Sequence, residues 1–265
     1  MSIPTSRRLT AALCAVACAG VVAACGSDDS STGDTGASCK ADFAVNQGFD
    51  RLFTTTPALQ TGQPPKGAQL TQFRTNYDKY VAGPISDLQE NAPDELSDEV
   101  DAAVAGATKF RETGDSKPLE TPAFQEQTRK IDKYYFDNCE GQKATIAGVD
   151  YGYTGTKPSY QAGQIRIAFA NQGKEFHELA LVRKKPGVTE SFDDLLERGD
   201  AAQSKVDFVT QVAADPGKED YIATSLSKGD YLMVCFIPKG STSSSADGKG
   251  PPHFVLGMKK EFSVS

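Results

Sequence analysis

Four side chains with the chemistry of a metal centre lie at two places in the chain. Cys235, His253 and Met258 follow one another near the C-terminus, and His177 lies upstream. A thiolate, two imidazoles and a thioether form the ligand set of a mononuclear copper site in which the methionine sulfur binds weakly on the axis. The chain has only two histidines, so it offers none for a second, catalytic copper centre.

The N-terminus predicts export. Two adjacent arginines precede an apolar run, Leu9–Ala24, which is shorter than the about 20 residues that span a bilayer. The small residues before Cys25 resemble the lipobox of bacterial lipoproteins, which implies cleavage before Cys25 and a lipid on this residue. A match that ends at Cys18 and an ordinary cleaved signal peptide are the alternatives. We therefore expect a signal peptide over residues 1–24 and a lipid-anchored protein on the extracytoplasmic face of the bacterial cell membrane.

Charge narrows the choice of partners. The formal net charge is −7, and it falls to −9 when Arg7 and Arg8 leave with the signal peptide. An acidic chain without a basic cluster argues against nucleic acid as a partner. The expected partners are the membrane, through the lipid on Cys25, and an unidentified redox protein. Residues 25–38 are polar and rich in glycine and serine, and are expected to form a flexible tether.

The cysteines fit an oxidising compartment. Six are present, at positions 14, 18, 25, 39, 139 and 235. The first two leave with the signal peptide, and the third is expected to carry the lipid. Cys39 and Cys139 bracket a helical segment and are expected to form a disulfide, although a bond between Cys139 and Cys235 is also compatible with the sequence. If Cys235 is the spare thiol, either metal binding or inert burial accounts for it.

Residues 39–141 have the pattern of a small antiparallel helical bundle. Apolar residues recur at three- and four-residue steps in three segments, Leu70–Leu88, Leu96–Phe110 and Phe124–Tyr135. Pro84 should kink or split the first segment, and a further short helix is expected over Phe49–Phe53. The domain has no histidine, and its acidic cluster near Asp94 suits a helix N-terminus. We expect a spacer or interaction domain without catalytic chemistry.

Residues 142–265 change to short β-strands separated by glycines. Ile165, Ile167 and Phe169 alternate at the period of a strand. The other expected strands are Lys143–Val149, Glu178–Val182, Val206–Val212, Asp220–Leu226, Asp230–Ile237 and Lys259–Val264. Ser191–Arg198 is predicted to be a short inserted helix. The fold class is therefore α+β and multidomain, with a helical bundle followed by an antiparallel sandwich or barrel.

Three stretches of the second domain resemble the cupredoxins, which are β-sandwich proteins that hold type 1, or blue, copper. Ala162–Asn171, followed by His177, is similar to the strand and loop that carry the first histidine ligand. Gly229–Cys235 has the Gly-x-Tyr-x-x-x-Cys pattern of the strand that delivers the cysteine, and Pro252–Met258 is similar to the loop with the second histidine and the methionine. The resemblance implies a Greek-key β-sandwich for residues 142–265.

The resemblance also implies a site and a function. His177, His253 and Cys235 would bind one copper ion, with Met258 as a weak axial ligand. Such ligands suit both Cu(I) and Cu(II), so the implied function is one-electron transfer by a membrane-anchored, extracytoplasmic protein that is not an enzyme. Asn171, at the end of a strand, is a candidate for tying the ligand loops together, but an ordinary turn asparagine is equally expected.

The segment between Cys235 and His253 departs from the family pattern because it is longer than in well-known members. Its central part, Lys239–Gly250, is rich in glycine and serine and is expected to be mobile. A loose site would suit a surface copper carrier or scavenger. A metal-free adaptor, a Cu(I)-only site and zinc at the same residues are further interpretations. Three apolar neighbours are expected to form a rim around an exposed ligand edge, and these are Phe176, Pro252 and Phe254.

Overall fold

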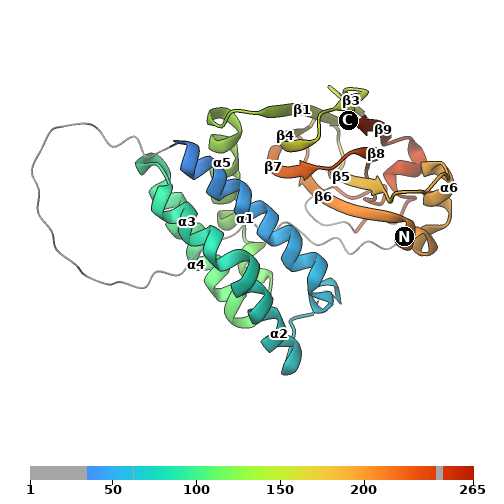
Figure 1. The fold of residues 1–265 in the computed structure, drawn as a ribbon. Coiled ribbons are helices and arrows are strands. Elements are labelled where there is room, and N and C mark those ends of the chain that lie inside the picture. The colour runs from blue at the N-terminus through green and yellow to red at the C-terminus, as the bar shows by residue number, and fades with distance from the viewer. Residues whose placement is uncertain (1–34, 62, 243–246) are drawn as a thin grey trace, which may run out of the picture. The chain divides into compact units, whose positions relative to one another are not determined.

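The computed structural model describes residues 35–61, 63–242 and 247–265 (Figure 1). The predicted signal peptide and the lipid site at Cys25 lie outside the described residues. The described chain divides into two compact units, with the division between Cys139 and Glu140. None of the described helices combines the length and apolar character that crossing a membrane requires.

The first unit is a bundle of helices around one apolar core. Its elements are α1 (Thr35–Thr55), η1 (Pro57–Thr61), α2 (Ala68–Tyr77), η2 (Asp78–Ala82), α3 (Gly83–Asn91), η3 (Asp94–Leu96), α4 (Ser97–Thr113), η4 (Lys117–Leu119) and α5 (Pro122–Asn138). Helix α1 is much longer than the expected helix over Phe49–Phe53, because Ala41 and Val45 extend the same buried face by whole turns. Residues 35–38, which we expected to belong to the tether, are the first residues of α1.

Pro84 splits the first of the three predicted helical segments, Leu70–Leu88, as expected. The segment becomes α2, a π-helical turn and α3, and Pro84 lies in the first turn of α3. Proline has no N–H, so it cannot donate to the carbonyl of Tyr80 four residues earlier. Gly48 of α1 lies directly against that carbonyl, since a Cβ on Gly48 would be 2.3 Å from the Tyr80 oxygen. A glycine at this position therefore allows α1 to approach the turn.

A disulfide joins Cys39 of α1 to Cys139 at the end of α5, with the Cα atoms 5.7 Å apart. The bond connects positions separated by 100 residues, so it restricts the unfolded chain of almost the whole helical unit. Cys139 immediately precedes the β unit, and β1 begins at Gln142. The disulfide therefore fixes the point in the sequence at which the helical unit ends.

Replacing Cys39 and Cys139 together by serine should lower the free energy of unfolding of the helical unit by about 2–5 kcal/mol, because the cross-link constrains the unfolded state. Urea unfolding followed by the helical circular dichroism signal measures this change. Cys235→Ser, which removes the free cysteine of the described residues, should leave the helical transition where it is. A double variant with an unshifted helical midpoint would contradict the role assigned to the disulfide.

The second unit is a sandwich of a four-stranded sheet, in the order β2-β1-β4-β7, and a five-stranded sheet, in the order β3-β9-β8-β5-β6. The strands are β1 (Gln142–Val149), β2 (Gly152–Thr154), β3 (Ser159–Tyr160), β4 (Gly163–Asn171), β5 (His177–Lys184), β6 (Val206–Ala214), β7 (Glu219–Leu226), β8 (Gly229–Val234) and β9 (Lys259–Val264). Strand β7 returns beside β4 after β5 and β6 have passed through the other sheet, which is a Greek-key arrangement. The predicted fold class, a helical unit followed by a Greek-key β-sandwich, is confirmed.

The sandwich is not wholly antiparallel, and this part of the prediction was wrong. Strands β1 and β4 pair in parallel over Gln142–Gly148, and β3 and β9 pair in parallel at the edge of the other sheet. The parallel pairs arise because β2 and β3 lie between β1 and β4 in the chain and carry it from one sheet to the other. Both short strands escaped prediction because three residues or fewer give no readable alternation.

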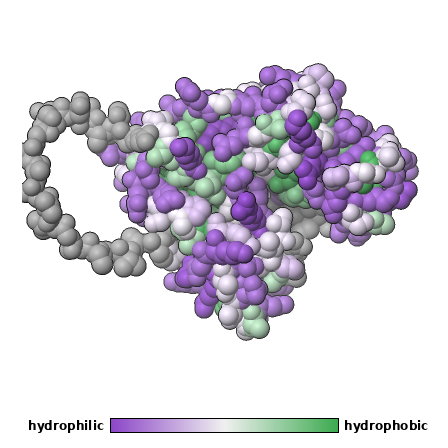
Figure 2. Space-filling model, in the orientation of Figure 1, coloured by the Kyte–Doolittle hydropathy of each residue, from purple (hydrophilic) through white to green (hydrophobic). Residues whose placement is uncertain are grey.

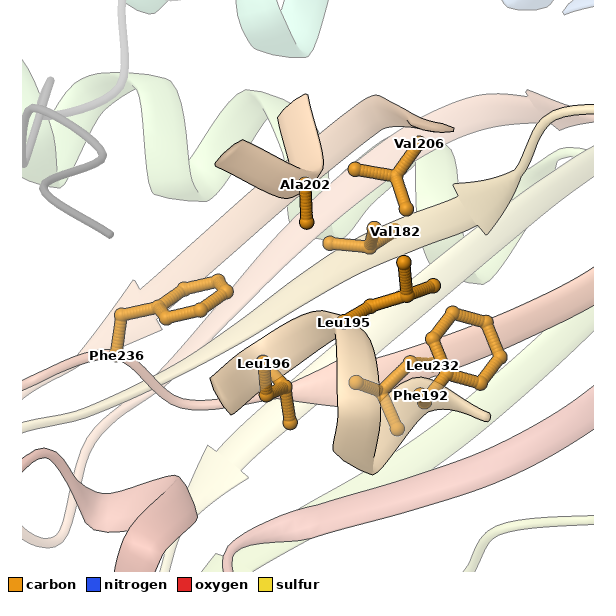
Figure 3. A pocket seen from close by; sticks show the side chains of 8 residues that line it. All are labelled: Val182, Phe192, Leu195, Leu196, Ala202, Val206, Leu232 and Phe236. Atoms are coloured by element: carbon orange, nitrogen blue, oxygen red, sulfur yellow. The ribbon is translucent and has the colours of Figure 1, made fainter. Parts of the chain in front are cut away.

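A short helix, α6 (Phe192–Glu197), and a 3-10 segment, η5 (Gly199–Lys205), cover the outer face of the five-stranded sheet. Apolar side chains from both segments and from β5, β6 and β8 point toward one another there and line a small cavity (Figure 3). Elsewhere hydrophilic residues cover most of the visible surface (Figure 2). The main core of the unit lies between the sheets, where Met233 packs among aliphatic and aromatic side chains.

Candidate metal centre

Two neighbouring strands and a short helical turn deliver the three donor residues. His177 is the first residue of β5, and Cys235 directly follows β8. These strands are antiparallel neighbours in which Ala180 pairs with Val234, so the start of β5 lies beside the end of β8. Side chains alternate along a strand, and Cys235 therefore continues the inward-facing row of Met233. His253 begins the 3-10 turn η6 (His253–Leu256).

The three donors converge at one buried point. The Nδ1 atoms of His177 and His253 are 3.0 Å apart, and the Sγ of Cys235 is 3.4 Å from Nδ1 of His253. One donor atom from each residue lies within 4.8 Å of the others, and all three residues have 0% exposure. Two donors bound to one ion at about 2.0–2.3 Å lie roughly 3–4 Å from each other, so this spacing suits a single ion.

Backbone hydrogen bonds close the segment from Cys235 to Met258 on itself. The N–H of Phe254 donates to the carbonyl of Cys235 at 2.9 Å, and the N–H of Cys235 donates to the carbonyl of Met258 at 3.1 Å. The N–H of Met258 donates to the carbonyl of His253 at 3.0 Å. Met258 is fully buried in a cluster with Cys235, Phe176 and Ile237. The structure thus brings Met258 beside the donors, and its axial binding to a metal stays a prediction.

The described part of Lys239–Gly250, a segment that we expected to be mobile, is hydrogen-bonded at its base. The N–H of Lys239 donates to the carbonyl of Pro251, and the N–H of Gly250 donates to the carbonyl of Lys239. Ser241 is fully buried, and its carbonyl accepts from the N–H of Phe176 at 2.8 Å. The base of the loop is therefore bonded both to itself and to the residue that precedes His177.

Strand β8 ends earlier than expected, at Val234 rather than Ile237. The reason is a side-chain contact: the N–H of Phe236 donates to Oε1 of Glu178 at 2.8 Å instead of joining the sheet ladder. Burial raises the pKa of Glu178 to about 7, although the Phe236 hydrogen bond partly offsets this effect. Burial also raises the pKa of the Cys235 thiol well above its ordinary range, and the charge of Glu178 adds to the shift. Without a nearby cation the Cys235 thiol therefore stays protonated, as a buried cysteine ordinarily does.

Asn171 bonds the segment before His177 to the end of β6. Its Nδ2 donates to the carbonyls of Glu175 and Ala214, both at 2.8 Å, and its Oδ1 accepts from the N–H of Gly173 at 2.9 Å. Ala214 is also the residue that pairs with His177 across β5 and β6. Asn171 is 1% exposed, so these three bonds have no competition from water.

Asn171→Ala should destabilise the β unit by about 1–3 kcal/mol for each buried carbonyl left without its donor. Chemical unfolding followed by near-ultraviolet circular dichroism measures the change. Asn138→Ala is a matched control, because the Asn138 side chain donates to one carbonyl at an exposed helix end. Equal effects of the two substitutions would contradict the structural role of Asn171.

Two carboxylates that sequence reasoning missed contact the outer nitrogens of both imidazoles. Asp150 Oδ1 lies 2.7 Å from Nε2 of His177, and Glu175 Oε2 lies 2.9 Å from Nε2 of His253. Asp150 sits in the turn after β1, and Glu175 sits in the loop before β5. In a chain with 35 acidic residues, no local pattern distinguishes these two.

Both carboxylates favour the ionised form. Partial burial alone would raise the pKa of Asp150, but hydrogen bonds from His177 and from the N–H of Lys174 outweigh it, and the pKa is lowered overall. Burial likewise acts to raise the pKa of Glu175, and the N–H of Gly240, with His253, lowers it overall. Burial lowers the pKa of His253, although Glu175 opposes this shift.

The expected apolar rim around an exposed histidine edge is wrong. His253 has no exposed surface, and Glu175 occupies the space beside its outer nitrogen. Phe176 is buried near Cys235, and Phe254 packs against Phe236 with the ring centroids 5.6 Å apart. The exposed apolar residues next to the site are instead Val255 and Leu256.

Comparisons with known proteins give structural neighbours only. The sequence matches no protein-family model and no curated protein. Auracyanin A, described as a "blue" copper protein from Chloroflexus aurantiacus, is 20% identical, with 46% of this chain and 99% of that chain covered and a TM-score of 0.28. Reduced auracyanin from Roseiflexus castenholzii is 18% identical (47% and 98% covered, TM-score 0.30), and rusticyanin from Thiobacillus ferrooxidans is 16% identical (48% and 79%, 0.29).

Structural similarity at this level does not identify the metal, so the metal is assigned from the topology and donor geometry of this chain. One sulfur and two imidazole nitrogens, buried at the end of two paired strands with a methionine beside them, fit one mononuclear type 1 copper ion. Hard cations such as magnesium and calcium prefer oxygen ligands and do not fit this donor set.

Proposed function

We propose that the β unit binds one copper ion through His177, Cys235 and His253, with Met258 as a weak fourth ligand, and that it carries single electrons. The observation that supports this most strongly is the convergence of one thiol and two imidazoles at one fully buried point. A copper ion bound by such ligands alternates between Cu(II) and Cu(I).

The protein contributes rigidity and exclusion of water. The β5–β8 pairing holds His177 beside Cys235, and backbone hydrogen bonds fix His253 and Met258 relative to Cys235. Fixed ligands limit the rearrangement that accompanies a change of oxidation state. The donors have no exposed surface, so a substrate has no direct route to them among the described residues. Electron exchange through the protein shell therefore fits the site better than catalysis.

Copper-loaded protein should contain one copper per chain and show an intense visible band from the Cys235 thiolate. Cys235→Ser should abolish the band, because the serine oxygen does not replace a soft thiolate ligand. Met233→Leu is the matched control, since Met233 lies on the same face of β8, within the core. Metal analysis and visible spectra measure both effects. A colourless Cu(II) complex, or zinc as the bound metal, would overturn the proposed electron transfer.

A surface copper carrier is the second function that these ligands permit. A carrier must exchange its metal, and exchange requires access to the ligands. Full burial of the donors and the hydrogen bonds at the base of Lys239–Gly250 favour retention instead. Rapid transfer of Cu(I) to a chelator, without a reversible redox couple, would favour the carrier.

We propose further that the protein acts at the extracytoplasmic face of the cell membrane, anchored by a lipid on Cys25, and exchanges electrons with a partner protein. The support is the sequence of the N-terminus, with a short apolar run before small residues and Cys25. The disulfide between Cys39 and Cys139 also suits an oxidising compartment.

Cys25→Ser should leave the protein without its lipid in a bacterial host, because Cys25 is the expected attachment point. Fractionation with detection of the protein, together with mass analysis of its N-terminus, measures the outcome. Cys18→Ser tests the alternative site and should leave the distribution unchanged. A lipid detected on the N-terminal part of the Cys25 variant would exclude this anchor.

A further inference from the structure

Each ligand imidazole contacts two chemically different neighbours. The Nδ1 atoms of His177 and His253 face each other and the Cys235 thiol, whereas both Nε2 atoms face carboxylates. His177 and His253 are fully buried, while the side chains of Asp150 and Glu175 are 27% and 17% exposed. The carboxylates therefore lie between the ligands and solvent.

The hydrogen bonds select which nitrogen of each ring can bind a metal. An ionised carboxylate only accepts hydrogen bonds, so each contact requires a proton on Nε2. A neutral imidazole with its proton on Nε2 has its lone pair on Nδ1. Both lone pairs then belong to nitrogens that lie 3.0 Å apart and within 4.8 Å of the Cys235 sulfur, an arrangement that one cation can satisfy.

Glu175 bonds other parts of the site as well as the ligand His253. Its Oε2 accepts from the N–H of Gly240 at 2.6 Å as well as from His253, and its Oε1 accepts from the hydroxyl of Tyr151 at 2.9 Å. The Tyr151 ring lies 4.9 Å from the His253 ring, measured between centroids. Glu175 thus bonds a ligand, the base of the long loop and the aromatic ring that covers the ligand.

Asp150 has a comparably built position. Both of its oxygens accept from the N–H of Lys174 at 3.1 Å, and Oδ1 also contacts His177. Gly173 leaves just enough room for this pair, because a Cβ there would lie 2.3 Å from Asp150 Oδ1 and 2.5 Å from His177 Nε2. The backbone therefore holds the carboxylate against the ring.

We propose that Asp150 and Glu175 are positioning residues that hold the two imidazoles with Nδ1 toward the metal and that, by their negative charge, favour Cu(II) over Cu(I). The second part rests on the proposed copper function. Carboxylates bonded to ligand imidazoles orient the rings and make them more basic. Negative charge near the ion stabilises the doubly charged state more than the singly charged state.

The metal-free protein gives the first test. Long-range nitrogen–proton NMR spectra at neutral pH should show Nε2 protonated in both rings of the wild type. Glu175→Ala removes the acceptor and should reduce Nε2 protonation in His253 while leaving His177 unchanged. Asp150→Ala should have the reverse selectivity. An Nε2 without its proton in either wild-type ring would overturn the positioning role, whether or not copper binds.

The charge is tested with variants that keep the hydrogen bond. Glu175→Gln and Asp150→Asn retain a carbonyl acceptor and should leave Nε2 protonated, but they should lower Cu(II) affinity by about 10–100-fold. If the loss is tenfold larger for Cu(II) than for Cu(I), the reduction potential rises by about 59 mV. Glu261→Gln removes an equal charge from an exposed position on β9 and should leave the potential unchanged.

The outcomes separate this inference from the proposed function. A wild-type protein without a copper band refutes electron transfer, and the NMR test still decides whether the carboxylates position the rings. The electrostatic role alone is refuted if the copper band is normal but the charge variants behave like the control. In that case Glu175→Gln and Asp150→Asn shift the reduction potential no more than Glu261→Gln does. Thermal unfolding of each variant identifies any that have lost the fold, and the wild-type NMR result does not depend on them.

Discussion

Burial of polar donors is the constraint on which the rest of the β unit depends. Two imidazoles and a thiol without exposed surface are unfavourable unless each polar atom has a partner. Asp150 and Glu175 supply partners for the outer nitrogens, and the inner atoms face one another. The neighbouring backbone brings these carboxylates to the rings. Gly173 leaves room for Asp150 beside His177, and the N–H of Gly240 at the base of the long loop bonds Glu175.

The β-strands place the donors where this burial is possible. Period-two alternation puts Met233 and Cys235 on the inner face of β8, and the pairing of β5 with β8 aligns His177 with them. Asn171 then fixes the loop that carries Glu175 and leads into His177. The same side chain therefore supports the ligand His177 and the carboxylate that contacts the other ligand, His253. A local loss at Asn171 therefore reaches both halves of the site.

Sequence reasoning found residues of rare types and periodic apolar patterns, and it missed common residue types whose contacts are distant in sequence. His177 and His253 stood out because the chain has no other histidine, and β4 because its apolar residues alternate. Asp150 and Glu175 resembled other acidic residues, and their contacts cross 27 and 78 positions of sequence. Parallel pairing of β1 with β4 was equally invisible, since register depends on where short strands send the chain. The length of α1 was underestimated because its buried face includes small residues, which give a weak periodic signal.

The long connection between Cys235 and His253 shows why sequence separation is a poor measure of how loosely a site is held. Closing a loop twice as long adds only about 0.6 kcal/mol of entropic cost. Against this, Lys239 and Gly250 bond across the base of the loop, Ser241 accepts from Phe176, and Gly240 donates to Glu175. Each such bond contributes about 0.5–1.5 kcal/mol, so a few of them offset the added length. The Gly240 bond also brings the loop to Glu175, which contacts the ligand His253. The extra residues of the loop therefore help to enclose the site.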